Sequence, residues 1–126
     1  MTNNRPLVLV SEDEIDINNL LTLVLEAENF SVLQAFDGDD AWQKFSTHAD
    51  EIDLLVTDLG LPKLGGVELI ERARRLKPAV RIIGASGFGR NNVREEVMRA
   101  GADEFLPKPY VTAELVATAK RLLGLT

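Results

Sequence analysis

The sequence predicts an α/β fold: a doubly wound parallel sheet of five strands in the order 2-1-3-4-5, as in flavodoxin-like (βα)5 proteins. Two observations lead to this prediction. Short apolar runs alternate five times with segments in which apolar residues recur at helical spacing, a pattern typical of βαβ units with helices on both faces of a parallel sheet. Right-handed crossover connections then leave few topologies for five such units.

Each predicted strand is a short, mostly apolar stretch that ends at polar or turn-forming residues. The first strand ends at Ser11, the second at Asp37-Gly38, and the third just before Asp58. The strands are expected at Leu7–Val10, Phe30–Phe36, Asp53–Thr57, Val80–Ala85 and Glu104–Leu106.

The helices are predicted from apolar side chains spaced three or four residues apart. Pro78 ends the third helix, and Gly101 is expected to cap the end of the fourth. The first helix is marked by Ile17, Leu20, Leu21 and Val24, and the others are expected at Asp39–His48, Val67–Leu76, Asn91–Ala100 and Thr112–Leu123.

The composition bounds the class of protein. A chain of 126 residues, 45% of them hydrophobic and 27% charged, has the size and composition of one globular domain, so we expect a single domain over residues 1–126. The net charge of −6 makes electrostatic binding of nucleic acid improbable. The absence of cysteine excludes thiolate chemistry, and the single His48 excludes a site that needs two histidines. No apolar run is long enough to span a membrane, and we expect a cytoplasmic location.

Charged and polar residues follow four of the five predicted strands. Glu12 and Asp13 follow the first strand, Asp58 the third, Ser86 the fourth and Lys108 the fifth. Because the carboxyl ends of parallel strands lie along one edge of the sheet, where open α/β folds bind ligands, we expect these side chains to meet.

Such a group of side chains has a definite chemistry. Two carboxylates about 4 Å apart repel by about 4 kcal/mol at an effective dielectric constant of about 20, so a divalent cation would stabilise the cluster. Oxygen ligands alone favour Mg2+, for which Mn2+ is expected to substitute. A phosphoryl group beside the cation would be bound by the Lys108 ammonium and the Ser86 hydroxyl. A neighbouring carboxylate is then placed to act as a nucleophile and form an acyl phosphate.

Four segments together resemble a known family. They are VLVSEDE (Val8–Glu14), DLLVTDLGLPKLGG (Asp53–Gly66), IIGAS (Ile82–Ser86) and GADEFLPKP (Gly101–Pro109). In this order, they resemble the receiver domains of two-component response regulators, the family of the bacterial chemotaxis regulator, and the resemblance extends from Leu7 to Leu123.

The resemblance implies a role for each residue of the site. Asp58 would accept a phosphoryl group from a histidine kinase or a histidine phosphotransfer protein. Glu12, Asp13, Asp58 and the backbone carbonyl of Gly60 would hold Mg2+, and Lys108 would pair with the phosphoryl group. The domain would catalyse only its own phosphorylation and dephosphorylation, so it would not be an enzyme in the usual sense.

The resemblance also implies a switch. Ser86 would move toward the phosphoryl group, Phe105 would turn inward with it, and the Lys108-Pro109 peptide would be cis. The output would be read by a downstream protein or an attached domain on the face formed by the fourth helix, the fifth strand and the fifth helix, and the domain would be a monomer or a weak dimer.

Four residues depart from the commonest pattern of the family. Glu12 stands in place of an aspartate, and its extra methylene group allows a water-bridged contact with the metal. Gly60 lacks a side chain that would shield the phosphoryl group, Phe88 occupies another position that tunes hydrolysis, and Phe105 replaces a tyrosine. These departures bear on the lifetime of the phosphorylated state.

Other interpretations of the same residues remain open. Ser11 and Glu14 have the spacing of a helix capping box. The glycines of Gly84–Arg90 resemble a phosphate-binding loop, but Arg90-Asn91 replaces the required Lys-Ser/Thr pair, so we do not expect nucleotide binding there and expect the glycines to give this loop mobility. The alternative functions are an interaction module that is never phosphorylated and a small metal-dependent phosphatase.

Overall fold

The computed structural model describes residues 5–87 and 93–125. Within these ranges strands and helices alternate, and the five-stranded parallel sheet has the order β2-β1-β3-β4-β5, which confirms the predicted topology. The elements are β1 (Leu7–Ser11), α1 (Ile15–Ala27), β2 (Ser31–Ala35), α2 (Gly38–Thr47), β3 (Ile52–Asp58), α3 (Gly66–Leu76), β4 (Arg81–Ser86), α4 (Val93–Ala100), β5 (Glu104–Pro107) and α5 (Thr112–Leu122).

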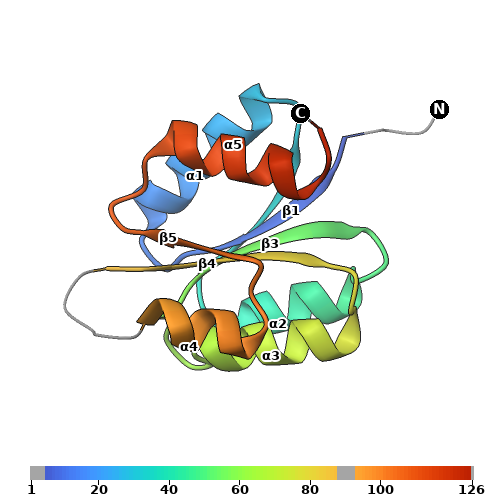
Figure 1. Ribbon diagram of the computed structural model, residues 1–126, viewed down its shortest axis with the longest axis vertical. Helices are drawn as coiled ribbons and strands as arrows, with labels where there is room; N and C mark the ends of the chain where they lie inside the picture. The colour runs from blue at the N-terminus through green and yellow to red at the C-terminus, as the bar shows by residue number, and fades with distance from the viewer. Residues whose placement is uncertain (1–4, 88–92, 126) are drawn as a thin grey trace.

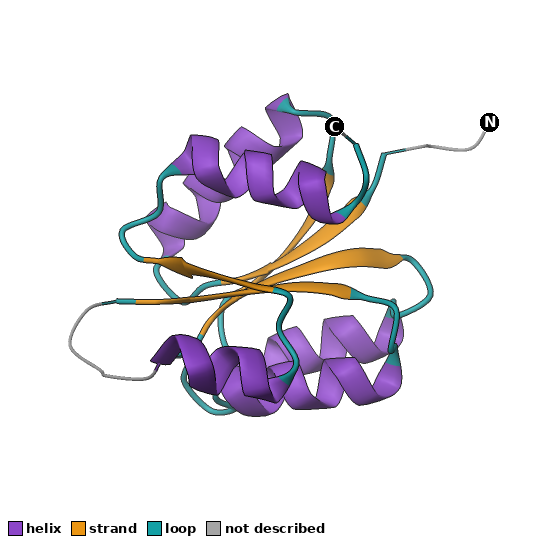
Figure 2. Cartoon of the chain, viewed as in Figure 1, coloured by secondary structure: helices purple, strands orange, loops and turns teal. Residues whose placement is uncertain are grey.

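The sheet separates two hydrophobic cores. Helices α1 and α5 cover one face, and α2, α3 and α4 cover the other (Figures 1 and 2). Successive residues of β1 point to opposite faces: Val8 and Val10 pack toward α1 and α5, and Leu9 packs toward α2 to α4. All three are fully buried, and β1 lies between β2 and β3 in the interior of the sheet.

Most predicted elements are found within two residues of their expected bounds. The third strand runs one residue further at its carboxyl end and includes Asp58. The fourth helix was expected to begin at Asn91, which lies outside the described residues, and the described helix begins at Val93. Gly101 follows that helix with a φ of +124°, in agreement with the predicted cap. Among the described helices, none is both long and apolar enough to cross a membrane.

The buried face of α1 differs from the prediction. Leu20 was expected on the apolar face, but 51% of its surface is exposed. The helix instead buries Asn18, Leu21 and Leu25. Asn18 can be fully buried because its side-chain amide is hydrogen-bonded on both sides. Of the other predicted residues, Leu21 is buried and Ile17 and Val24 are half-buried, so the difference is confined to Leu20.

The predicted capping box is wrong. Ser11 is the last residue of β1, where it pairs with Ala35 and Thr57, and the N-cap residue of α1 is Glu14. The Glu14 side chain makes no capping hydrogen bond in the described part of the chain, and the buried Ser11 Oγ has no partner there. The strand pairing therefore takes precedence over the local capping pattern.

The structure adds a second argument against a phosphate-binding loop at Gly84. Gly84 lies inside β4 rather than in a loop. A Cβ atom at this position would come within 2.5 Å of Val97 Cγ1, so the glycine allows α4 to pack closely against the strand. The residues from Phe88 to Arg90 lie outside the described ranges.

Candidate functional site

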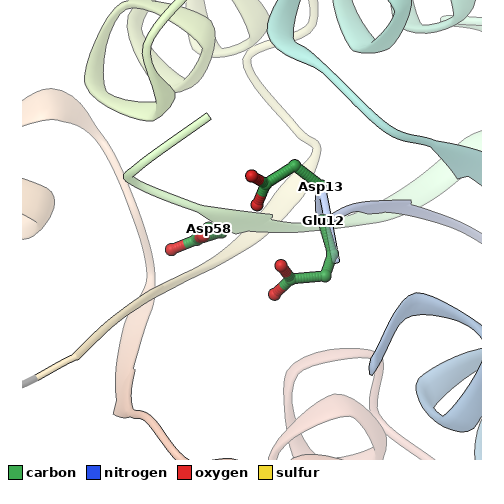
Figure 3. A group of neighbouring side chains, drawn as sticks. All are labelled: Glu12, Asp13 and Asp58. Carbon is green, nitrogen blue, oxygen red and sulfur yellow. The ribbon is translucent and has the colours of Figure 1, made fainter. Parts of the chain in front are cut away.

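Three carboxylates meet at the carboxyl ends of β1 and β3. The register of these parallel neighbours pairs Ser11 with Thr57, so Glu12 and Asp58 leave the sheet side by side. One carboxylate oxygen from each of Glu12, Asp13 and Asp58 lies within 4.8 Å of the other two. Figure 3 shows the three side chains extending toward the same side of the strand ends. The structure thus brings together the acidic residues that the sequence placed on this edge.

The three carboxylates differ in their exposure to solvent. Glu12 is fully buried, Asp58 is 7% exposed, and Asp13 is exposed. The site is therefore open to solvent on the side of Asp13 and closed on the side of Glu12. Backbone amides fix the two buried carboxylates: Glu14 N–H donates to Glu12 Oε2 (3.1 Å) and Gly60 N–H donates to Asp58 Oδ1 (3.3 Å).

Lys108 brings a positive charge to these carboxylates. Its Nζ atom lies 2.9 Å from Glu12 Oε1 and 3.4 Å from Asp58 Oδ2. Its backbone N–H donates to the carbonyl of Ser86 (2.8 Å), which ties the end of β5 to the end of β4. The Lys108-Pro109 peptide bond is cis, as the family resemblance implied.

Burial and charge act in opposite directions on this ion pair. Burial raises the pKa of Glu12, and the hydrogen bond from Lys108 only partly offsets that effect. Burial alone would lower the pKa of Lys108, but the hydrogen bond to Glu12 and the charge of Asp58 outweigh burial and raise it. Lys108 therefore stays protonated and compensates part of the negative charge of the site.

The other predicted residues lie around this cluster. Gly60 is in the turn after β3, where a Cβ atom would lie 3.8 Å from Asp58 Oδ2 and would meet no other atom of the described residues within 4 Å. Ser86 ends β4 and pairs with Pro107, the residue before Lys108. Phe105 lies in β5, pairs with Gly84, and packs against the core on the α2–α4 side. Phe88 lies outside the described residues.

The turn that carries Gly60 is held by backbone hydrogen bonds on both sides. The N–H of Leu59 donates to the carbonyl of Ala85 (3.0 Å), and the N–H of Gly66 donates to the carbonyl of Leu59 (3.1 Å). A Cβ atom at Gly66 would come within 2.6 Å of Leu59 Cα. Glycine at the start of α3 therefore lets the helix approach the end of β3 closely, next to Asp58.

Sequence reasoning missed two residues near the site. Tyr110 places its ring 5.7 Å from Lys108 Nζ, and its hydroxyl is buried with no hydrogen-bond partner among the described residues. Burial, followed by the charges of Glu12 and Asp58, raises the pKa of Tyr110. Asn18 of α1 donates to the backbone carbonyl of Glu12 (3.0 Å). No local sequence pattern around either residue predicts these contacts, although Tyr110 directly follows the Lys108-Pro109 pair.

The donor set fits a hard divalent cation. Among the described residues, the cluster offers carboxylate oxygens and no histidine nitrogen. Mg2+ and Ca2+ prefer oxygen ligands, and Mg2+ commonly keeps several waters beside one or two carboxylates. The open side at Asp13 leaves room for such waters. The same arrangement of an acidic cluster beside a lysine suits the binding of a phosphoryl group.

Comparison with known proteins identifies the family that the chain resembles. The family model described as "Response regulator receiver domain" matches residues 8–120. The response regulator RppA of Synechocystis sp. is 34% identical over 91% of this chain and 49% of its own length. The transcriptional regulatory protein CpxR of Escherichia coli K12 is 34% identical over 92% of this chain and 48% of its own. The chain thus spans about half the length of these curated relatives.

Solved structures share the fold over nearly the whole chain. A response regulator receiver domain protein from Clostridium thermocellum superposes with a TM-score of 0.89 at 26% identity, covering 94% of both chains. A putative response regulator from Chloroflexus aurantiacus superposes with a TM-score of 0.88 at 28% identity, covering 96% of this chain and 99% of the other.

Proposed function

Because this chain belongs to the family of response regulator receiver domains, we propose that Asp58 accepts a phosphoryl group from a phosphohistidine, carried by a histidine kinase or a histidine phosphotransfer protein. One observation carries this proposal. Asp58 ends β3 with one carboxylate oxygen 3.4 Å from Lys108 Nζ, inside the acidic cluster formed with Glu12 and Asp13.

The proposed step exchanges one bond to phosphorus for another. A carboxylate oxygen of Asp58 forms the new O–P bond while the N–P bond of the donor phosphohistidine breaks, and the electron pair of that bond stays on the imidazole nitrogen. Lys108 would pair with a phosphoryl oxygen, and Ser86 would donate its hydroxyl hydrogen to another. Gly60 N–H already holds Asp58 Oδ1, which fixes the orientation of the acceptor.

We assign the cation of this site as Mg2+, with Mn2+ as a substitute. Glu12, Asp13, Asp58 and the Gly60 carbonyl would hold it, and when bound it would supply positive charge to the incoming phosphoryl oxygens. Asp13 contributes the exposed carboxylate through which the ion would exchange with solvent.

The proposal includes an output. We propose that Ser86 and Phe105 report phosphorylation to the face formed by α4, β5 and α5, where a downstream protein or an attached domain would read it. The hydrogen bond from Lys108 N–H to the Ser86 carbonyl and the pairing of Phe105 with Gly84 support this route. We place this exchange in the cytoplasm and expect the domain to act as a monomer or a weak dimer.

The test is phosphorylation by acetyl phosphate, a small acyl phosphate donor, followed by intact-mass measurement. With Mg2+ present, the wild-type chain should gain one phosphoryl group, and none should be added when EDTA is present. Asp58→Asn should gain none. The matched control is Asp53→Asn on the same strand, because Asp53 is exposed and its role as acceptor for the Leu7 amide is kept by asparagine. A wild-type chain that is never modified would favour the interaction module.

A further inference from the structure

We propose that Asn18, a buried residue of α1, is a positioning residue that fixes the backbone between Glu12 and Asp13 and thereby sets the affinity of the acidic site for Mg2+. This inference rests on the proposed function, because it concerns the metal site of that function. Asn18 itself would not touch the ion: both of its amide protons are directed at backbone carbonyls.

The amide of Asn18 ties together the ends of two strands. Nδ2 donates to the carbonyl of Glu12 (3.0 Å), just after β1, and to the carbonyl of Ala35 (2.9 Å), the last residue of β2. The same Ala35 carbonyl accepts a hydrogen bond from Glu12 N–H (3.0 Å). The backbone of Glu12 is therefore held at both its N–H and its carbonyl.

The other side of the Asn18 amide is also held. Its Oδ1 atom accepts a hydrogen bond from Gln34 Nε2 (2.9 Å). Because Oδ1 faces a donor while Nδ2 faces two carbonyls, a flipped amide would place donor against donor and oxygen against oxygen. This fixed orientation, together with complete burial, gives Asn18 a single position in the fold.

The bond to Glu12 matters because of which peptide it holds. The Glu12 carbonyl belongs to the planar peptide unit that joins Glu12 to Asp13, so fixing this carbonyl fixes the positions of both Cα atoms. The two carboxylates lie in different environments, one buried against Lys108 and one exposed. Rotation of this peptide unit would move both of them relative to Asp58, on the neighbouring strand.

The experiment measures the binding of Mg2+ alone by isothermal titration calorimetry on the full chain, well below the melting temperature. Asn18→Leu keeps the approximate volume of the side chain and removes the amide that donates to the carbonyls of Glu12 and Ala35; of these two bonds, the one to Glu12 holds the peptide unit of the metal site. We expect its dissociation constant for Mg2+ to be higher than that of the wild type by about three- to tenfold, the change that corresponds to one hydrogen bond.

A matched control separates positioning from stability. Thr22→Val, on the same helix, removes the hydrogen bond from Thr22 Oγ1 to the Asn18 carbonyl (2.9 Å) and its longer contact with Asn18 Oδ1 (3.4 Å). It leaves the two bonds from Asn18 Nδ2 to Glu12 and Ala35 in place. Both variants should melt at lower temperature than the wild type. The Mg2+ affinity of Thr22→Val should stay within about twofold of the wild type, less than the effect of one hydrogen bond.

The outcomes distinguish this inference from the proposed function. If the wild type binds Mg2+ and Asn18→Leu binds it equally well, or if Thr22→Val loses as much affinity as Asn18→Leu, the role of Asn18 is only structural and the inference is wrong. If the wild type itself binds no Mg2+, the metal site of the proposed function is wrong as well. Should Asn18→Leu fail to fold, Asn18→Ser replaces it, because a serine hydroxyl has one hydrogen and cannot donate to both carbonyls. The same comparison with Thr22→Val applies.

Discussion

The ammonium nitrogen of Lys108 lies 2.9 Å from Oε1 of Glu12, a carboxylate that is separated from it by 96 positions in the sequence and is fully buried. The lysine is closer to Glu12 than to Asp58, the proposed phosphoacceptor. Glu12 is therefore compensated by Lys108 in the resting site. A phosphoryl group on Asp58 would draw the same ammonium group toward itself.

Removing the positive charge should destabilise the fold. In Lys108→Met, two carboxylates lose their partner, and we expect the free energy of unfolding at pH 7 without divalent cations to fall by about 2 kcal/mol. This is less than is usual for breaking a fully buried ion pair, because Lys108 is 15% exposed. The measurement is urea unfolding, with Lys120→Met as control. Lys120 pairs with Glu28 on the surface (2.6 Å), so its loss should cost less than about 0.5 kcal/mol.

The pH dependence of this difference has a definite sign. The pKa of Glu12 is raised in the folded protein, so its ionised form opposes folding above its unfolded value of 4.5. Loss of Lys108 should raise that pKa further. The loss in free energy of unfolding of Lys108→Met, relative to the wild type, should therefore be largest near neutral pH. It should shrink as the pH falls through the folded pKa of Glu12 toward 4.5. An equal deficit at all pH values would contradict the ion-pair account.

The exposed carboxylate of the cluster should control the response to Mg2+. The wild type should melt at higher temperature in Mg2+, since a ligand at about 100 times its dissociation constant stabilises a protein by about 2.7 kcal/mol. Asp13→Asn should lose most of this response and, without metal, should be at least as stable as the wild type because one repulsive charge is gone. Asp16→Asn is the control, because Asp16 is also exposed but lies in the first turn of α1 and outside the acidic cluster; this variant should respond like the wild type. A full Mg2+ response in Asp13→Asn would count against its role as a ligand.

The open space at Gly60 predicts a change in the lifetime of the phosphorylated state. Among the residues that the structure describes, a Cβ atom there meets nothing nearer than Asp58 Oδ2 at 3.8 Å, so a larger side chain should be accommodated and should shield the acyl phosphate from water. We expect Gly60→Met to lose its phosphoryl group several times more slowly than the wild type. The loss is measured from the intact mass of the protein over time, after the phosphoryl donor is removed. Gly65→Ala is the control, because a Cβ atom at Gly65 has no neighbour within 4 Å in the described part of the chain. Equal rates in all three proteins would show that water reaches Asp58 from another direction.

Asp37 should contribute stability that acid removes. Its Oδ1 atom accepts a hydrogen bond from Asp40 N–H (2.7 Å) at the start of α2, and its Oδ2 atom lies 3.4 Å from Lys63 Nζ. The Asp40 amide lowers the pKa of Asp37, so the stabilisation is fully present above the ordinary value of 3.8 and is lost as the pH falls through the lower folded value.

The corresponding variant is Asp37→Ala, compared with Asp39→Ala on the exposed first turn of the same helix. Thermal unfolding at pH 7 should show a larger loss for Asp37→Ala than for Asp39→Ala. The difference between the wild type and Asp37→Ala should shrink in acid as the wild-type carboxylate becomes protonated. A difference that grows in acid would have the wrong sign for a helix cap.

The sequence carried enough information to predict the topology and the meeting of the three carboxylates. Both follow from the order of the elements, because parallel strands bring their carboxyl ends to one edge whatever the details of packing. Glu12 and Asp58 needed only the correct register of β1 and β3 to become neighbours. The predicted bounds of the strands differ from the observed bounds by one residue at some ends, as at the start of β3, which was expected at Asp53 and begins at Ile52.

The contacts that the sequence did not reveal are those that depend on tertiary packing. Periodicity marked Leu20 as inward-facing, and the helix buries Asn18 instead because carbonyls of β1 and β2 satisfy its amide. The pairing of Lys108 with Glu12 as well as with Asp58 joins residues 96 and 50 positions apart, so no local pattern in the sequence could reveal it. Likewise Ser11 had the local signal of a helix cap, but pairing with both neighbouring strands keeps it in β1.

The central claim, that Asp58 accepts the phosphoryl group, is tested most directly by chemical mapping of the modified residue. Borohydride reduces an aspartyl phosphate to homoserine, which peptide mass spectrometry then places in the sequence. After treatment with acetyl phosphate and Mg2+, homoserine should appear at position 58. Homoserine at position 13 or 53, with aspartate retained at 58, would contradict the account.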